Sequence, residues 1–156
     1  MTDYKMRRSN RQMSDTDAKE VLHNGEYGVL STIGSDGCPY GVPLNFAFDG
    51  ERIYFHCAKD VGHKQENLSF RNAVSFCVVC SNAVKSAEFT EKFDSVIVFG
   101  TAQKAGDSQK RYGLELLIKK YSSEFYEKGM AYIEKAFDKT DVYEIGIAKI
   151  SGKRHE

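Results

Sequence analysis

Two Asp-Gly dipeptides divide the N-terminal third of the chain into three short segments rich in apolar, β-branched and aromatic residues. The dipeptides are Asp36-Gly37 and Asp49-Gly50, and Asp-Gly is a preferred sequence for the tight turn of a β-hairpin. The segments around these turns, 26–34, 38–48 and 52–58, have the length and composition of β-strands. The pattern predicts an antiparallel meander of three strands.

Both prolines of the chain, Pro39 and Pro43, fall in the second of these segments. A proline has no N–H to donate, so a central strand loses a ladder hydrogen bond at each one. We therefore expect this strand to lie at a sheet edge, a bulge or a barrel rim. Backbone groups left unpaired there are available to a ligand, but a plain edge strand also explains the two prolines.

The rest of the chain alternates helix-like and strand-like segments. The predicted helices cover 16–25, 62–72 and two parts of 107–139 that separate near Ser122-Ser123; the predicted strands cover 73–80, 95–105 and 141–150; and 81–94 is a polar connection. Six strands with interposed helices indicate an α+β protein, mainly β, with a closed or nearly closed antiparallel barrel and peripheral helices. A chain of 156 residues fits one domain, 1–156.

The charge balance limits the partners of the protein. Lys and Arg number 22, as do Asp and Glu, so there is no net positive field to attract nucleic acid or an anionic membrane. The basic N-terminal arm, 1–13, is expected to be a solvated tail. No apolar run approaches the roughly 20 residues that span a bilayer, and the arm lacks the apolar region of a secretory signal. We expect a cytoplasmic protein that binds neither nucleic acid nor membrane.

The cysteines and histidines do not predict a metal site. Cys77 and Cys80 match the CxxC spacing, but residues three apart on a strand point to opposite faces, so we interpret both as structural. His56, Cys57 and His63 are the other metal-ligand candidates. His56 and Cys57 diverge as strand neighbours, and no fourth ligand stands at a familiar spacing.

The joint between the strand 52–58 and the helix 62–72 is compatible with an anion site. The free N–H groups and positive dipole end of a helix that begins near His63 favour a negative group. Lys64 occupies the first turn, where a cation is disfavoured unless an anion is bound nearby, and Arg71 is predicted to share its helical face. Phosphate binding is one interpretation, and a solvated surface helix is the other.

Alternation along 52–58 sorts the side chains of this strand into two sets. Ile53, Phe55 and Cys57 are expected in the core, which leaves Tyr54, His56 and Ala58 on the surface that borders the joint.

Several segments, in this order and spacing, resemble a known superfamily. They are YGVLST, DGCPYGVPLNFAFDGERIYFHCA, GHK, VSF, FTEKFDSVIVFGTA and the terminal ISGKR, together with the arm MRRSNRQM. They are similar to the pyridoxamine 5′-phosphate oxidase-related FMN-binding split-barrel superfamily, and most to its 5-nitroimidazole reductase (nitroimidazole-resistance) branch. The resemblance covers nearly the whole chain and is weakest over 104–140. It implies a split β-barrel homodimer with two FMN molecules at the subunit interface.

The resemblance also implies which residues hold FMN. The phosphate is assigned to His63 and Lys64, with Arg71 assisting. The isoalloxazine ring is assigned to the backbone of Pro43, Leu44 and Asn45, with His56, Cys57 and Ala58 beside it, and Ser95 and Val98 are candidates for reaching the partner subunit's flavin. The basic residues that recognise pyridoxal in the true oxidases are not recognisable, which argues against pyridoxamine phosphate as the substrate.

The implied activity is that of an NAD(P)H-dependent, FMN-containing reductase acting on nitroaromatic or similar small acceptors. His56 is the candidate catalytic residue, as a proton donor facing the acceptor, and a hydrogen-bonded structural histidine is the alternative. A flavin- or haem-binding split-barrel protein without turnover is the alternative for the whole chain.

Overall fold

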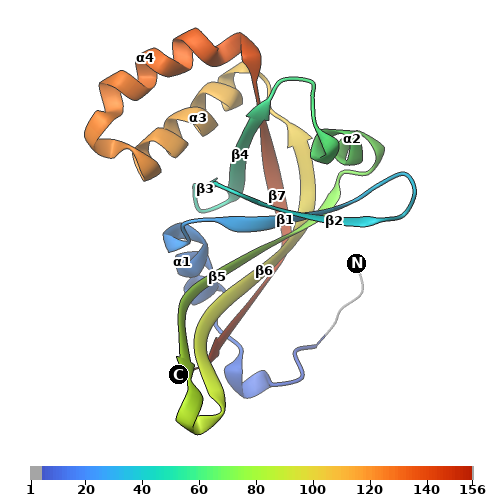
Figure 1. Ribbon diagram of the computed structural model, residues 1–156, viewed down its shortest axis with the longest axis vertical. Coiled ribbons are helices and arrows are strands. Elements are labelled where there is room, and N and C mark those ends of the chain that lie inside the picture. The colour runs from blue at the N-terminus through green and yellow to red at the C-terminus, as the bar shows by residue number, and fades with distance from the viewer. Residues whose placement is uncertain (1–4, 156) are drawn as a thin grey trace.

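Within residues 5–155, the part of the chain that the computed structural model describes, seven strands pair into one antiparallel sheet (Figure 1). The strands are β1 (Gly28–Ile33), β2 (Pro39–Leu44), β3 (Ala47–Phe48), β4 (Arg52–Ala58), β5 (Ala73–Lys85), β6 (Thr90–Lys104) and β7 (Thr140–His155), in the sheet order β2-β1-β5-β6-β7-β4-β3. The helices are α1 (Asp15–Asn24), α2 (His63–Phe70), α3 (Asp107–Tyr121) and α4 (Tyr126–Ala136), with short 3₁₀ turns at Ser9–Arg11, Ser86–Glu88, Ser123–Phe125 and Phe137–Lys139. No helix in this part of the chain has the length and apolar character to cross a bilayer.

The predicted three-stranded meander is wrong, although its strands exist. β2 and β3 stand at opposite ends of the sheet order, yet only Asn45 and Phe46 separate them in the chain. The sheet therefore curls until its two edges meet, and the fold is a split β-barrel. Phe46 is fully buried, and its N–H donates to the hydroxyl of Tyr121 at the end of α3 (3.1 Å). β2 lies at an edge, as its two prolines predicted.

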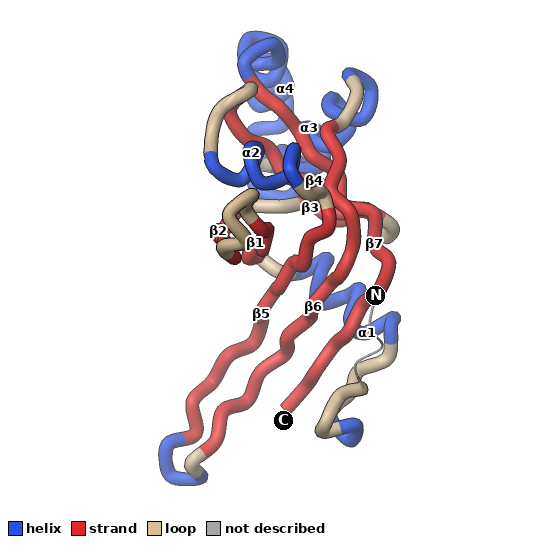
Figure 2. The backbone as a smooth tube through the Cα atoms, turned by 90° about the vertical axis from the view of Figure 1, so that its right-hand side faces the viewer, coloured by secondary structure: helices blue, strands red, loops and turns tan. Residues whose placement is uncertain are grey.

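The segment 81–94 is not a loose connection, as the sequence suggested. β5 and β6 continue through it as a long hairpin that turns at Ser86–Glu88, and β7 pairs with β6 as far as His155 (Figure 2). The hairpin carries a bulge between Cys80 and Ala83. Its polar composition misled the prediction because the extension is mostly solvent exposed and lacks an alternating apolar face.

The main core lies inside the curled sheet and is covered on one side by α1. Ser14 caps this helix, its Oγ accepting from the N–H of Asp17 (3.1 Å), and Ala18, Val21 and Leu22 turn inward. Burying each large aliphatic side chain stabilises the fold by about 1.5–3 kcal/mol. Because α1 packs against β5, β6 and β7, it covers part of the core-facing side of these central strands.

A second core lies between β4 and the α3–α4 pair. It contains Leu114 and Leu117 of α3, Ile133 of α4 and Tyr54 of β4. The expectation that Tyr54 lies on an exposed surface is wrong: its exposed fraction is 3% because α3 covers that face of β4.

The N-terminal arm is partly docked rather than wholly solvated. Gln12 bridges to Lys153 of β7, Met13 joins the main core, and the guanidinium of Arg11 hydrogen-bonds the ring of His155 (2.6 Å). Residues 1–4 of the predicted arm lie outside the described residues.

Candidate functional site

The joint between β4 and α2 has the backbone form of an anion-binding turn. α2 begins at His63, and its N-cap, Gly62, has φ +116° and provides no side-chain cap. The N–H groups of Gln65 and Glu66 bond to the carbonyl of Gly62. The first N–H groups of a helix have no intrahelical acceptor, so those at the start of α2 are directed toward whatever lies in front of the helix.

A buried carboxylate holds this turn in place. Asp141 of β7 is 3% exposed, and its Oδ2 accepts from the N–H of Asp60 (3.1 Å) and from the ammonium of Lys104 (2.8 Å). Lys104 also contacts Asp60 Oδ1 (3.0 Å). Asp60 itself has φ +53°, a left-handed conformation that these contacts maintain. The network ties the turn to β6 and β7, the rigid part of the sheet.

The protonation state of Asp141 follows from these contacts. Burial disfavours its charged form, but the hydrogen bonds from Lys104 and from the N–H of Asp60 outweigh burial, so the pKa of Asp141 lies below its ordinary value. The same hydrogen bonds raise the pKa of Lys104. Both groups are therefore charged at neutral pH.

Gln65 connects the first turn of α2 to the end of β4. Its Nε2 donates to the carbonyl of Ala58 (2.8 Å) and contacts the thiol of Cys57, while its Oε1 is buried without a partner. Cys57 is 7% exposed, and burial raises the pKa of its thiol. The side chain of Cys57 therefore faces the interior, away from the exposed His56, as strand alternation predicts. Among the described residues no three His, Cys, Asp or Glu side chains form a group able to hold a metal ion.

The start of α2 also contacts the edge strand β2. The ring of His63 packs on Tyr40 of β2 with 4.4 Å between centroids. Deeper in the joint, the amide of Asn67 donates to Thr32 Oγ1 of β1 (3.0 Å), and both side chains are buried. These contacts bring the start of α2, where the residues predicted to bind phosphate lie, next to the proline-containing strand β2. The two segments are well separated along the chain.

His56 and Lys64 lie close enough to interact electrostatically. Loss of water around the imidazole, and then the positive charge of Lys64, lower the pKa of His56 below its ordinary value. The His56 residue is nonetheless exposed, as is Ala58 beyond it. At neutral pH His56 is therefore a neutral ring that carries one N–H donor and one acceptor nitrogen.

The β2 candidates differ in what they expose. Pro43 and Asn45 are exposed, whereas Leu44 is half-buried against the main core. The amide of Asn45 is 3.5 Å from the carbonyl oxygen of Glu26. A ligand bound on this edge can contact the side chains of Pro43 and Asn45, but it can contact only the backbone of Leu44.

Three further candidates lie away from the start of α2: Arg71, which was expected to assist with the phosphate, and Ser95 and Val98, which were expected to reach the partner subunit's flavin. Arg71 is the C-cap of α2 with φ −147°, so helical periodicity does not place it on the face of Lys64, and α2 spreads the two over roughly 10 Å along its axis. Val98 is fully buried in the main core, so its side chain does not reach a ligand. Ser95 lies on the opposite face of β6, between Val79 of β5 and Lys153 of β7.

The outer face of the sheet carries a row of small and apolar side chains that the sequence analysis missed. The row crosses five strands in register: Pro43, Val29, Cys77, Ile97 and Ser151. Ile97 and the nearby Val79 are exposed. Buried and half-buried positions alternate strictly along β1 in the structure, but its sequence GVLSTI does not alternate apolar and polar residues and gave no signal for this face.

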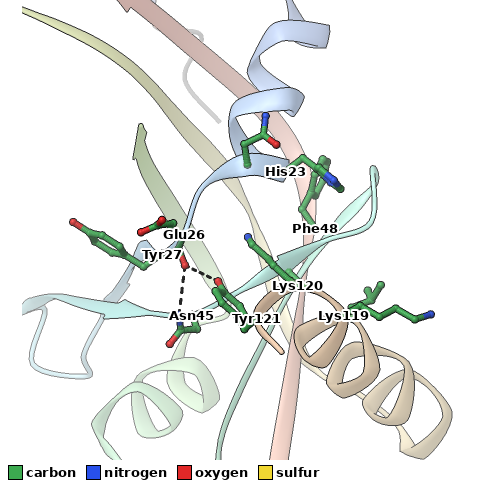
Figure 3. A pocket seen from close by; sticks show the side chains of 11 residues that line it. His23, Glu26, Tyr27, Asn45, Phe48, Lys119, Lys120 and Tyr121 are labelled. Carbon is green, nitrogen blue, oxygen red and sulfur yellow. Dashed lines mark hydrogen bonds between the residues drawn. The ribbon is translucent and has the colours of Figure 1, made fainter. Parts of the chain in front are cut away.

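A cavity of about 850 Å³ opens on another side of Asn45, between the ends of α1 and α3 (Figure 3). It is lined by His23, Asn24, Glu26, Tyr27, Asn45, Ala47, Phe48, Leu116, Lys119, Lys120 and Tyr121. No local sequence motif predicts this cavity, because its walls come from three separate stretches of the chain.

The family comparison covers almost all of the described chain. A family model described as pyridoxamine 5′-phosphate oxidase matches residues 14–154. No curated protein sequence matches the chain.

Solved structures of similar fold come from several bacteria. A candidate 5-nitroimidazole antibiotic resistance protein from Bacteroides thetaiotaomicron aligns with TM-score 0.78 and 18% identity, covering 91% of this chain and 85% of that one. The flavocytochrome Anf3 from Azotobacter vinelandii aligns with TM-score 0.83 and 19% identity, covering 98% and 73%. An FAD- and haem-binding protein from Mycobacterium smegmatis aligns with TM-score 0.81 and 20% identity, covering 94% and 74%. These likenesses establish the split-barrel fold.

Proposed function

This chain belongs to the pyridoxamine 5′-phosphate oxidase family, and we propose that it is an FMN-binding flavoprotein that reduces small nitroaromatic or related acceptors with NADH or NADPH. The observation that carries the proposal is the joint between β4 and α2. There an uncapped helix start carries Lys64 beside two exposed histidines, His56 and His63, and His63 packs on Tyr40 of the edge strand β2.

The FMN phosphate is proposed to bind in front of α2. The N–H groups of the first turn and the ammonium of Lys64 supply hydrogen bonds and positive charge, and His63 flanks them. A bound phosphate explains why a lysine stands at the positive end of a helix dipole, where it is otherwise disfavoured. The network around Asp141 holds the turn in this form before FMN binds, so the free energy of binding is not reduced by a cost of ordering the turn.

The isoalloxazine ring is proposed to lie along β2 at Pro43, Leu44 and Asn45. The prolines remove two N–H donors from this edge strand, and Ala58 at the end of β4 offers little steric hindrance. His56 is proposed to face the acceptor. Its neutral ring, held so by partial dehydration and by Lys64, donates one N–H to an oxygen of the acceptor. When bound, the flavin supplies the hydride-accepting and electron-donating chemistry.

The partner is proposed to be a second copy of this chain. The outer row of Pro43, Val29, Cys77, Ile97 and Ser151 continues directly from the proposed ring site, and exposed apolar residues on a sheet face favour burial against another surface. A two-fold interface on this face places Ser95 of one protomer near the flavin edge of the other. The dimer predicts elution at about twice the mass of the 17.6 kDa chain.

Visible absorbance of the purified protein tests the cofactor. A flavin spectrum supports the proposal, whereas a Soret band supports the haem-binding alternative, which the Azotobacter and Mycobacterium proteins make worth measuring. Anaerobic bleaching of the flavin by NADH or NADPH, followed by reoxidation with a nitroimidazole, distinguishes a reductase from a carrier. A flavin that neither donor bleaches refutes the reductase activity and leaves flavin binding.

The phosphate site is tested by comparing FMN with riboflavin, which lacks the phosphate. Lys64→Ala is expected to weaken FMN binding about ten- to hundredfold, because a charge-assisted hydrogen bond of about 1.5–3 kcal/mol is lost, and to leave riboflavin binding nearly unchanged. Lys59→Ala is the matched control, since Lys59 is an exposed lysine of the same turn. Equal losses for FMN and riboflavin refute the assignment.

A further inference from the structure

The cavity between α1 and α3 contains a lysine whose charge has no acceptor. Lys120 lies in the last turn of α3, and Figure 3 shows its side chain in the middle of the lining residues, between His23 and Phe48 on one side and Tyr121 and Asn45 on the other. Its Nζ is buried and makes no hydrogen bond to any residue in the described range 5–155. The ammonium instead sits 3.9 Å from the ring centroid of Phe46.

Such an arrangement is costly unless something compensates for it. Burying an ammonium without an acceptor removes its hydration, and the cation–π contacts with the rings of Phe46 (3.9 Å) and Tyr121 (5.3 Å) return only about 0.5–2 kcal/mol each. The position at the end of α3 is favourable for a cation, but the helix dipole acts equally on an exposed lysine. Lys119 shows this: it is exposed, and it pairs with Glu115 across one turn (2.7 Å). Burial of Lys120 therefore needs a separate explanation.

The polar group nearest the buried end of the cavity, the Tyr121 hydroxyl, is already engaged. The Tyr121 hydroxyl donates to the carbonyl oxygen of Glu26 (2.6 Å) and accepts from the N–H of Phe46 (3.1 Å). Because its single O–H is used in this way, the hydroxyl has no donor left for an anion. The remaining walls include Phe48, Ala47 and Leu116, which are apolar. Beside these apolar residues, a buried ammonium that has no hydrogen-bond acceptor among residues 5–155 is suited to the acidic group of an amphipathic anion.

We propose that this cavity is a binding site for a small organic anion with one acidic group and an apolar body, and that Lys120 is the residue that binds the acidic group. The cavity volume lies in the range of small-molecule sites. The site is distinct from the proposed phosphate turn, which lies at the start of α2, and it does not depend on a bound flavin.

The charge state of Lys120 gives the site a pH dependence. Burial lowers the pKa of Lys120 to about 8. The anion binds the protonated amine, so affinity is constant below about pH 8 and falls about tenfold per pH unit above it. The titratable groups that face the cavity or Lys120 are His23 of α1, Glu26 and Tyr27 before β1, Cys80 of β5, and Lys119 and Tyr121 of α3. Lys120→Met separates their titration from that of Lys120.

The test is a calorimetric titration of the full chain with benzoate, and with benzamide as the neutral molecule of the same shape. The wild type is expected to prefer benzoate. Lys120→Met is expected to lower benzoate affinity about ten- to hundredfold, as for loss of a charge-assisted contact, and to abolish the preference. Lys128→Met, at an exposed lysine of α4 outside the cavity lining, is the matched control and is expected to keep both the affinity and the preference.

Three results overturn the proposal. The first is a wild type that binds benzoate no better than benzamide, which can be established even if Lys120→Met fails to fold. The second is a wild-type affinity that does not fall above about pH 8. The third is displacement of benzoate by excess FMN, which assigns the cavity to the flavin; undiminished benzoate binding in excess FMN supports a separate site.

Discussion

Asp141→Asn tests whether the carboxylate on β7 positions the turn before α2. The substitution keeps the size of the side chain and an oxygen that accepts from the N–H of Asp60, but it removes the negative charge. The charge is what Lys104 contacts at 2.8 Å, and Asp141 is almost completely buried. The variant therefore isolates the electrostatic part of the network from its shape.

The expected loss of unfolding free energy is about 2 kcal/mol. A hydrogen bond to a charged group contributes about 1.5–3 kcal/mol, against about 1 for a neutral pair, so the retained Asp60 contact loses about 1 kcal/mol. The Lys104 contact adds only about 0.2–1 kcal/mol, because the Lys104 side chain is 45% exposed and returns to water. For a chain of this length, 2 kcal/mol corresponds to a Tm lower by about 4–8 °C.

Urea unfolding followed by circular dichroism measures this loss, since the chain contains no tryptophan to report by fluorescence. Asp49→Asn is the matched control. Asp49 also accepts from two backbone N–H groups, those of Glu51 and Arg52, but it is exposed, so a change within about 0.5 kcal/mol is expected there. FMN affinity of the Asp141 variant, measured by quenching of flavin fluorescence, is expected to fall as well.

A stability of Asp141→Asn equal to that of Asp49→Asn refutes the argument that charge holds the turn. Normal FMN affinity in a destabilised variant refutes only the link between the turn and phosphate binding. The stability result therefore stands independently of the proposed function.

Three further outcomes are expected. The stability advantage of the wild type over Asp141→Asn is present above about pH 4 and disappears as the pH falls through the lowered pKa of Asp141, because the folded state binds this proton less readily than the unfolded state. Urea titrations at a series of pH values measure this advantage. An advantage that grows on acidification contradicts the argument. Gly100→Ala destabilises by about 1–3 kcal/mol or more, since its Cβ falls 2.1 Å from the carbonyl oxygen of Gly146, whereas Gly146→Ala, with 4.0 Å to its nearest neighbour, is tolerated in the same thermal unfolding assay. Ellman's reagent labels the exposed Cys38 quickly and Cys57 only on unfolding, because Cys57 is buried and burial raises the pKa of its thiol. Rapid labelling of a second thiol in the folded protein, assigned to Cys57 by mass spectrometry, contradicts the packing around Gln65.

Local signals in the sequence were sufficient for several features. The prolines of β2 predicted an edge strand because each one removes a ladder donor. The start of α2 at His63 follows from Gly62, whose positive φ suits glycine. The divergence of His56 and Cys57 follows from strand alternation alone.

Other features depend on contacts that no local pattern records. The separation of β2 from β3 is stabilised by the hydrogen bond between the N–H of Phe46 and the hydroxyl of Tyr121, 75 residues away in the chain. Tyr54 is buried by α3, which follows it by some fifty positions, so alternation on β4 alone placed it wrongly. Lys120 reads as an ordinary basic residue near a helix end, and only the tertiary structure shows that its ammonium is buried. Sequence periodicity reports which face a residue occupies, and the topology decides what covers that face.

The position of β7 in the sheet has a consequence for folding in the cell. Of the seven strands in residues 5–155, β7 comes last along the chain, yet it lies between β6 and β4 and links β4 and β3 to the other strands. Until it emerges from the ribosome, the β3–β4 hairpin and the edge of β6 remain unpaired, and unpaired edges are prone to association. Folding of the barrel is therefore expected to wait for β7, and chains truncated before Thr140 are expected to need chaperones or to aggregate.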